Sequence, residues 1–105
     1  MFGHPNMWLS KYKTAVFVHG CYWHRHNSCK YAYVPKSRVD FWTTKFENNV
    51  KIDEVVRRNL AIRGIRVLII WECTVKKMLM SETEEQRLLE DIEHFFQSEE
   101  GYLEL

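Results

Sequence analysis

The chain has 105 residues, of which 46% are hydrophobic, and its formal net charge is +1. This length suits one small domain, spanning 1–105, which gains stability from a structural metal because its core is limited. No apolar stretch approaches the ~20 residues of a membrane-spanning helix. Three cysteines cannot all pair within one chain, which argues against a disulfide framework and for an intracellular location.

The predicted strands come first in the chain. The turn residues Gly3 and Pro5 precede a short strand at 7–9, and a turn at 11–13 leads into a buried strand rich in β-branched residues at 14–18. Residues 19–37 then form a loop rich in histidine and cysteine, which Pro35 closes. A second apolar run at 65–71 predicts a central strand, reached through a helical crossover.

Helical periodicity occupies the rest of the chain. A helix is predicted to begin near Ser37, which is a favourable N-cap, and to end at Gly64. Asn48 and Asn49 could bend or interrupt it. The apolar positions of this helix, which we expect to face inward, are Val39, Trp42, Phe46, Ile52, Val55, Val56 and Leu60. The sequence therefore predicts an α/β fold with a mixed sheet of three or more strands flanked by helices.

Residues 81–105 are predicted to form a last, acidic helix. Ser81 and Glu84 have the spacing of a capping box at its start. Its apolar stripe contains Leu88, Leu89, Ile92, Phe95 and Phe96. Residues 81–105 contain one basic and nine acidic residues, whereas residues 1–80 contain 14 basic and five acidic ones. The basic body indicates a polyanionic partner, and two solvated faces that partly neutralise each other are the alternative.

Metal-ligating residues gather in the loop after the second strand. Cys21, His26 and Cys29 lie in the segment VHGCYWHRHNSC (residues 18–29), and Cys73 follows the apolar run at 65–71. If the two long strands are neighbours, their ends meet and the three cysteines converge. Zinc prefers four tetrahedral Cys and His ligands. The sequence therefore predicts one structural zinc site, with free thiols and a surface histidine as the alternative.

Two histidines and two aromatic residues of the same loop remain. His19 and His24 flank Gly20-Cys21 at the C-terminal end of a strand, where α/β sheets place ligands. Histidine exchanges protons near neutral pH, so both are catalytic candidates, and supporting or surface roles are the alternative. Tyr22 and Trp23 could stack on bases or wedge between them, unless they belong to the core.

Basic residues in or beside this loop are candidates for phosphate contacts. They are Lys11, Lys13, Arg25, Lys30, Lys36, Arg38 and Lys45. Ordinary solvation is the alternative for at least half of them. If the contacts exist, affinity for nucleic acid falls steeply with salt concentration.

The segments VHGCYWHRH, FWTTKF and GIRVLIIWEC resemble the very-short-patch-repair (Vsr) DNA mismatch endonucleases, over roughly residues 3–80. This resemblance implies a restriction-endonuclease-like core with one structural zinc. It also implies magnesium-dependent nicking of double-stranded DNA beside a T:G mismatch, in the bacterial cytoplasm at the nucleoid.

The resemblance also implies individual roles. His24 would activate water or assist the leaving group, and His19 would contact the scissile phosphate. The backbone carbonyl of Val18 would help to bind the catalytic magnesium, and Tyr22 with Trp23 would stack into the duplex. The zinc ligands that it implies are Cys21, His26, Cys29 and Cys73.

Three departures from the family pattern bear on activity. Asn6 in Gly3-His4-Pro5-Asn6 stands where the family has its metal-binding aspartate. Magnesium prefers anionic oxygens, and the bound metal lowers the pKa of the attacking water. Because Asn6 supplies no anionic oxygen, we expect the rate of DNA cleavage to be reduced by orders of magnitude. Because the chain begins just before this motif, we also expect it to lack the family's N-terminal arm, which embraces DNA and adds an acidic catalytic residue. Ile52 replaces the arginine of the family's NVxRD segment, and Ile65 replaces the tryptophan of its GWRV segment.

Three functions stay open at this point. The chain could be a magnesium-dependent mismatch endonuclease, a zinc-stabilised DNA-binding module without cleavage, or a domain whose cysteine and histidine cluster only supports the fold.

Overall fold

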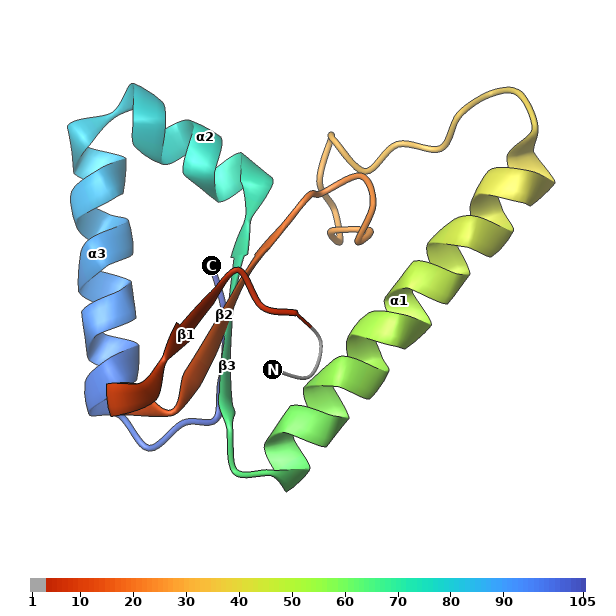
Figure 1. Cartoon of the computed structure of the whole chain (residues 1–105). Coiled ribbons are helices and arrows are strands. Elements are labelled where there is room, and N and C mark those ends of the chain that lie inside the picture. The colour runs from red at the N-terminus through yellow and green to blue at the C-terminus, as the bar shows by residue number, and fades with distance from the viewer. Residues whose placement is uncertain (1–3) are drawn as a thin grey trace.

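The computed structural model describes residues 4–105. Its elements in chain order are β1 (Met7–Leu9), the 3-10 helix η1 (Ser10–Tyr12), β2 (Thr14–His19), α1 (Val39–Ile62), β3 (Arg66–Trp71), α2 (Glu72–Met80), α3 (Glu82–Gln97) and β4 (Tyr102–Glu104). The sheet lies between α3 on one side and α1 on the other (Figure 1). No helix of the described part is long and apolar enough to cross a membrane.

The sheet is mixed and has the strand order β1-β2-β3-β4. β1 and β2 pair antiparallel through the turn at 10–13, whereas β2 and β3 pair parallel and are joined by the long loop and α1. β4 pairs parallel with the other side of β3, as the third parallel strand of the sheet. The predicted α/β fold with a mixed sheet is confirmed. The central position of β3 explains why its sequence is apolar almost throughout.

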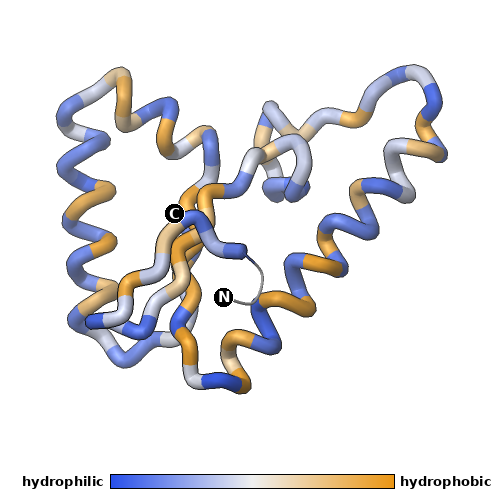
Figure 2. The backbone as a smooth tube through the Cα atoms, in the orientation of Figure 1, coloured by the Kyte–Doolittle hydropathy of each residue, from blue (hydrophilic) through white to orange (hydrophobic). Residues whose placement is uncertain are grey.

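Each face of the sheet has its own core. Toward α1, Phe17 and Ile69 pack with the fully buried Leu60. Toward α3, Leu68 packs with Phe95, and each is only 1% exposed. Successive strand residues point to opposite faces, so β2 and β3 supply both cores. Figure 2 shows that hydrophobic residues are frequent along these strands.

Helix α1 differs from its prediction in three respects. It begins at Val39, after Arg38 in a left-handed conformation, so the expected N-cap at Ser37 is wrong. It continues through residues 48 and 49, since Asn49 donates from its side chain to the Trp23 carbonyl and leaves the helical ladder intact. The inward positions expected from periodicity are wrong for three residues, which are largely exposed: Val39, Ile52 and Val55.

The tertiary arrangement explains the exposure of Val39 at the start of the helix. Helix α1 packs against the sheet toward its C-terminal end, where Leu60 is fully buried. Toward its N-terminal end the helix diverges from the sheet, and the loop at 20–37 lies on that side (Figure 1). Gly64 has a φ of 74° just after α1, which agrees with its predicted role at the helix end.

Two elements were not predicted. Helix α2 follows β3 without a connecting turn, so the sequence has no turn residues that would mark where the strand ends and the helix begins. β4 has only three residues, too few to show a period. The segment that leads from α3 into β4 is held by Arg66 at the start of β3. The Arg66 guanidinium donates to the carbonyls of Ser98 and Glu100 in this segment.

Helix α3 agrees with its prediction at the N-terminus, but the predicted extent to residue 105 is wrong, because the helix ends at Gln97 and Tyr102–Glu104 pair with β3 as a strand. The Ser81 hydroxyl accepts a hydrogen bond from the Glu84 amide at 3.4 Å, as the capping box requires. Leu88 and Phe95 of the predicted stripe are buried, but Leu89 is 52% exposed and does not belong to it. The acidic residues of this helix lie on the side of the sheet opposite to α1 (Figure 1).

Candidate functional site

Parallel pairing of β2 and β3 creates the site. The register places His19 opposite Trp71 at the C-terminal ends of both strands. The residues that follow each strand therefore meet at one edge of the sheet, and Cys73 lies in the first turn of α2 rather than in a strand. Only this long-range pairing brings Cys73 to the loop at 20–37.

The four predicted zinc ligands come together there. One ligand atom from each lies within 4.8 Å of the others in the set Cys21, His26, Cys29 and Cys73. The Cys73 sulfur is 3.5 Å from His26 Nδ1. In a zinc tetrahedron with Zn–S of about 2.3 Å and Zn–N of about 2.0–2.1 Å, sulfur and nitrogen lie about 3.5 Å apart. The donor set and its spacing therefore fit a zinc ion that has no open position.

The surroundings of this cluster hold its side chains in place. The His26 ring stacks on Trp71 with centroids 4.2 Å apart, and the His26 amide donates to the Cys21 carbonyl. The sulfur of Cys21 accepts the Cys73 amide at 3.4 Å. Burial raises the pKa of the Cys21 thiol to about 11. A bound cation would offset this cost of forming the thiolate.

A second cluster lies beside the first. His24 Nδ1 is 2.6 Å from Asp53 Oδ2, and the rings of His19 and His24 stack with centroids 3.9 Å apart. One ligand atom from each of the three residues lies within 4.8 Å of the others. The pKa of His19 is lowered to about 4, mainly by burial and secondly by the nearby His24. His19 is therefore neutral at physiological pH.

Asp53 was not among the predicted site residues. It lies on α1, 29 positions after its partner His24, and only the crossover brings the two together. The sequence did contain a signal for Asp53. The family's NVxRD segment corresponds to residues 49–53 of this chain, and its final acidic residue is Asp53.

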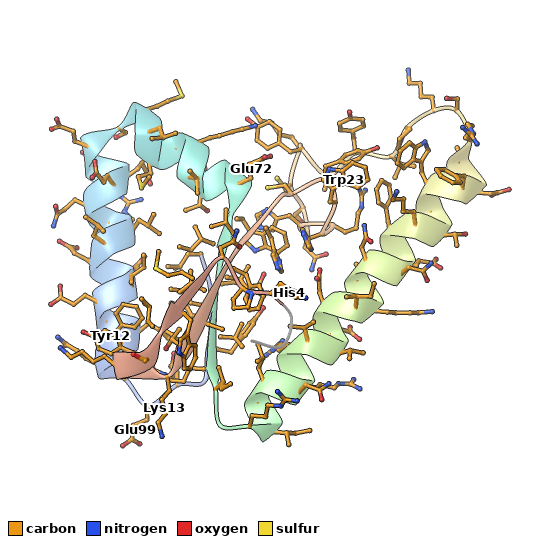
Figure 3. All side chains as sticks on the ribbon, in the orientation of Figure 1. His4, Tyr12, Lys13, Trp23, Glu72 and Glu99 are labelled. Carbon is orange, nitrogen blue, oxygen red and sulfur yellow. The ribbon has the colours of Figure 1, made fainter. Side chains whose placement is uncertain are left out.

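The second cluster opens into a cleft of about 280 Å³ between α1 and the sheet. The polar and charged residues that line it are His4, Asn6, His19, His24, Asp53 and Arg57. His4 lies in the space between β1 and α1 (Figure 3). A carboxylate, three imidazoles and a guanidinium thus line one solvent-accessible hollow, which is a suitable setting for hydrolysis of a charged ester.

The oxygens at the predicted magnesium position are a poor match for that ion. The side-chain oxygen of Asn6 accepts the Val18 amide at 2.8 Å and so extends the β1–β2 ladder. Asn6 and the Val18 carbonyl offer only neutral oxygens, whereas magnesium prefers carboxylates and water. These two residues do not fit a magnesium ion.

The aromatic residues of the loop meet those of α1. Trp23 is 44% exposed, and its ring lies 6.0 Å from that of Trp42, with the Lys45 ammonium 5.5 Å away (Figure 3). Tyr22 is half-buried and packs on Phe46. Of the two adjacent loop aromatics, Trp23 therefore offers the accessible ring.

The predicted phosphate contacts occupy different places. Arg25 donates to the Tyr22, Ala32 and Tyr33 carbonyls, so its guanidinium braces the loop. Arg38 lies over the Phe41 ring near the start of α1. Lys30 lies over Tyr31, and Lys36 is exposed in the loop. Lys11 and Lys13 lie at the opposite end of β2 from the loop (Figure 3).

Comparison with known proteins identifies relatives. The family model of the DNA mismatch endonuclease Vsr matches residues 1–30. The chain is 40% identical over 90 residues to the type II nicking enzyme V.NmeAIP of Neisseria meningitidis, covering 86% of this chain and 64% of that protein. It is 39% identical over 74 residues to the DNA mismatch endonuclease Vsr of Escherichia coli, covering 70% and 47%.

A third relative is the type II nicking enzyme V.XorIIP of Xanthomonas oryzae, with 37% identity over 76 residues, covering 72% of this chain and 55% of that protein. The chain thus spans about half to two thirds of the length of these relatives. Over the residues that these matches cover, the chain belongs to the Vsr DNA mismatch endonuclease family.

Proposed function

We propose that this chain binds double-stranded DNA at a T:G mismatch and nicks one strand by hydrolysis at the His19–His24–Asp53 cluster. The observation that carries the proposal is the 2.6 Å contact between His24 and Asp53 in a cleft, with His19 stacked on His24. The names of the relatives, a mismatch endonuclease and nicking enzymes, support the same reaction class.

Asp53 determines which nitrogen of His24 is available. When His24 Nδ1–H donates to the carboxylate, Nε2 is left unprotonated and can accept a proton. In the proposed reaction a water oxygen attacks the phosphorus while His24 Nε2 takes the water proton. The bond from phosphorus to the leaving oxygen of the sugar then breaks, and the protonated His24 can return its proton to that oxygen.

His19 has a different role in this scheme. Its ring is buried between Phe17 and Trp71, and its depressed pKa keeps it neutral. A neutral imidazole can donate one N–H to a phosphate oxygen. We therefore propose that His19 orients the scissile phosphate and that His24 transfers the protons.

The cysteine cluster would support this site by holding zinc. A zinc ion bound by four protein side chains has no open position, so its role is structural. It would tie the loop that carries His24 to α2, since three of its ligands come from the loop and Cys73 comes from α2. The rigid loop then presents His24 toward Asp53.

DNA would contact an aromatic–basic patch beside the cleft, formed by Trp23, Arg38, Phe41, Trp42 and Lys45. Phe41 and Trp23 are each more than 40% exposed, and the two cations lie over these rings. Exposed rings can stack on unpaired bases, and the cations can contact phosphates. We expect a duplex, made accessible at its mismatch, to lie across this patch in the bacterial nucleoid.

Asn6 favours a second candidate function, that of a zinc-stabilised DNA-binding module without cleavage. The amide offers no charge to a metal ion. Asn6→Asp is a matched variant, because a carboxylate of the same shape still accepts the Val18 amide. The test measures nicking and binding of a T:G duplex and a C:G duplex by the natural chain, Asn6→Asp and Asp53→Asn, with magnesium and with manganese.

The outcomes separate the candidates. Nicking of the T:G duplex by the natural chain, lost in Asp53→Asn, supports the endonuclease. Nicking by Asn6→Asp alone, or DNA binding without nicking by any form, supports the binding module. If the natural chain does not distinguish the mismatched duplex from the C:G duplex in either assay, the proposed mismatch function is wrong.

A further inference from the structure

Trp71 contacts both side-chain clusters of the site. Its indole stacks on His26 of the cysteine cluster with ring centroids 4.2 Å apart, and it meets His19 of the cleft edge to face with centroids 5.4 Å apart. Trp71 ends β3 and is only 7% exposed, so the position of its ring determines the space left for both imidazoles. A group that fixes this indole therefore influences both clusters.

The indole is held by a carboxylate from β4. Glu104 Oε1 accepts the Trp71 Nε1–H at 2.8 Å, and Glu104 Oε2 accepts the Tyr102 hydroxyl at 2.7 Å. Each carboxylate oxygen has its own donor, and hydrogen bonds to a carboxylate are stronger than those between neutral groups. The Arg57 guanidinium lies over the Tyr102 ring, 3.5 Å from its centroid. The carboxylate therefore has one defined orientation toward the indole.

We propose that Glu104 is a positioning residue, which orients His19 and His26 through Trp71. Its effect on DNA cleavage rests on the proposed function, in which His19 orients the scissile phosphate. Its effect on the two imidazole rings stands on the contacts of Trp71 alone.

Strand pairing places Glu104 beside the indole. β4 pairs parallel with β3, and the Trp71 amide donates to the Leu105 carbonyl at 3.0 Å. Alternate strand residues share a face, so Tyr102 and Glu104 lie on the same face of the sheet as Trp71. Leu103, between them, packs into the core on the opposite face, toward α3. The two faces of this short strand can therefore be perturbed separately.

Loss of the carboxylate would leave a buried indole N–H without its acceptor. A buried Trp N–H normally has a hydrogen-bond partner, and leaving it unpaired is costly. The indole would turn toward water or another acceptor, and the stacked His26 ring and the His19 contact would move with it. A displacement of about 1 Å in a catalytic arrangement can lower the rate about 100-fold.

The test compares Glu104→Leu, Glu104→Gln and Leu103→Ala in the full chain loaded with zinc. Leucine removes the acceptor, whereas the glutamine oxygen can still accept the indole N–H. Leu103→Ala is the matched control for the docking of β4, because it weakens the packing of this strand without touching Trp71. Thermal unfolding and zinc content check that each variant is folded.

The first readout is the NMR spectrum of the His19, His26 and Trp71 rings. An indole shifts the resonances of protons that lie over its face, so these resonances report where the ring lies. Glu104→Leu should move the ring resonances of both histidines and the indole N–H resonance. Glu104→Gln should keep the histidine resonances close to those of the natural chain, and Leu103→Ala should leave all of them in place.

The second readout is nicking of the T:G duplex. Glu104→Leu should lower kcat at least about tenfold, since losing a supporting partner typically costs about 10–100-fold in activity. KM should change little, because the carboxylate does not touch the DNA in this scheme. Glu104→Gln should retain most of the activity, and Leu103→Ala should retain kcat.

The proposal is overturned if Glu104→Leu leaves the ring resonances unchanged, or if Leu103→Ala moves them as far. It is also overturned if the natural chain nicks DNA and Glu104→Leu moves the rings without lowering kcat. If the natural chain nicks no duplex, the proposed endonuclease is wrong, and the ring resonances alone decide whether Glu104 positions the two histidines.

Discussion

Replacing Cys73 by serine tests whether the cysteine cluster holds the fold together through a metal. Cys73 is a partly exposed residue in the first turn of α2, and its sulfur contacts His26 across the site. Serine has nearly the same shape but binds zinc poorly. If the cluster binds zinc, the change removes one of four ligands and releases α2 from the loop.

The expected magnitude follows from comparing three serine variants. Without a metal, the loss in the free energy of unfolding would depend on burial. Cys21→Ser, at a fully buried residue, would lower it by about 1–3 kcal/mol, whereas Cys29→Ser and Cys73→Ser would lower it by well under 1 kcal/mol. With zinc, all three should cost at least about 3 kcal/mol, because structural zinc contributes about 10–16 kcal/mol in small domains. For a chain of 105 residues, 3 kcal/mol lowers Tm by at least about 12 °C.

The assay combines metal content by native mass spectrometry with thermal unfolding. The natural chain should carry zinc in the cluster, all three serine variants should lose it, and a chelator should lower the Tm of the natural chain but not that of the variants. Thr74→Ser, the neighbouring position in α2, is the matched control and should retain both zinc and Tm. The reasoning is refuted if Cys21→Ser alone is destabilising and the metal content of the other two variants is unchanged.

Three further predictions concern the core, the helix cap and DNA binding. Phe95→Ala, at a side chain 1% exposed, should reduce the free energy of unfolding by about 3–5 kcal/mol in urea titrations, and a loss below 1 kcal/mol would contradict the packing of α3 on the sheet. Ser81→Ala should cost about 0.5–1 kcal/mol, since its bond to the Glu84 amide is long at 3.4 Å; no measurable loss would mean that this cap does not stabilise α3. Trp23→Ala should weaken binding to a T:G duplex at least about tenfold, with little change in Tm or in the salt dependence of binding. Lys45→Met should reduce the slope of log affinity against log salt concentration by about one. Unchanged affinity in both variants would exclude the aromatic–basic patch as the DNA contact.

The amino-acid sequence by itself determined the elements that have strong local signals. The apolar runs at 14–18 and 65–71 are strands, since an apolar run of five to seven residues suits a strand buried on both faces. Ser81 begins α3 because its hydroxyl and the Glu84 amide are close in the chain. The family could also be recognised, because the segment from Val18 to Cys29 combines residue types at a characteristic spacing.

Tertiary structure decided what depends on residues far apart in the chain. Periodicity predicted a buried face along all of α1, but Ile52 and Val55 are exposed, whereas Phe46 is buried against the loop and Leu60 against the sheet. β4 is a strand because β3 offers it a free edge, and its three residues have no local signal. Asp53 became part of the cleft only when the crossover placed α1 beside His24, since local sequence specifies which face a residue occupies on its own helix and not what lies opposite.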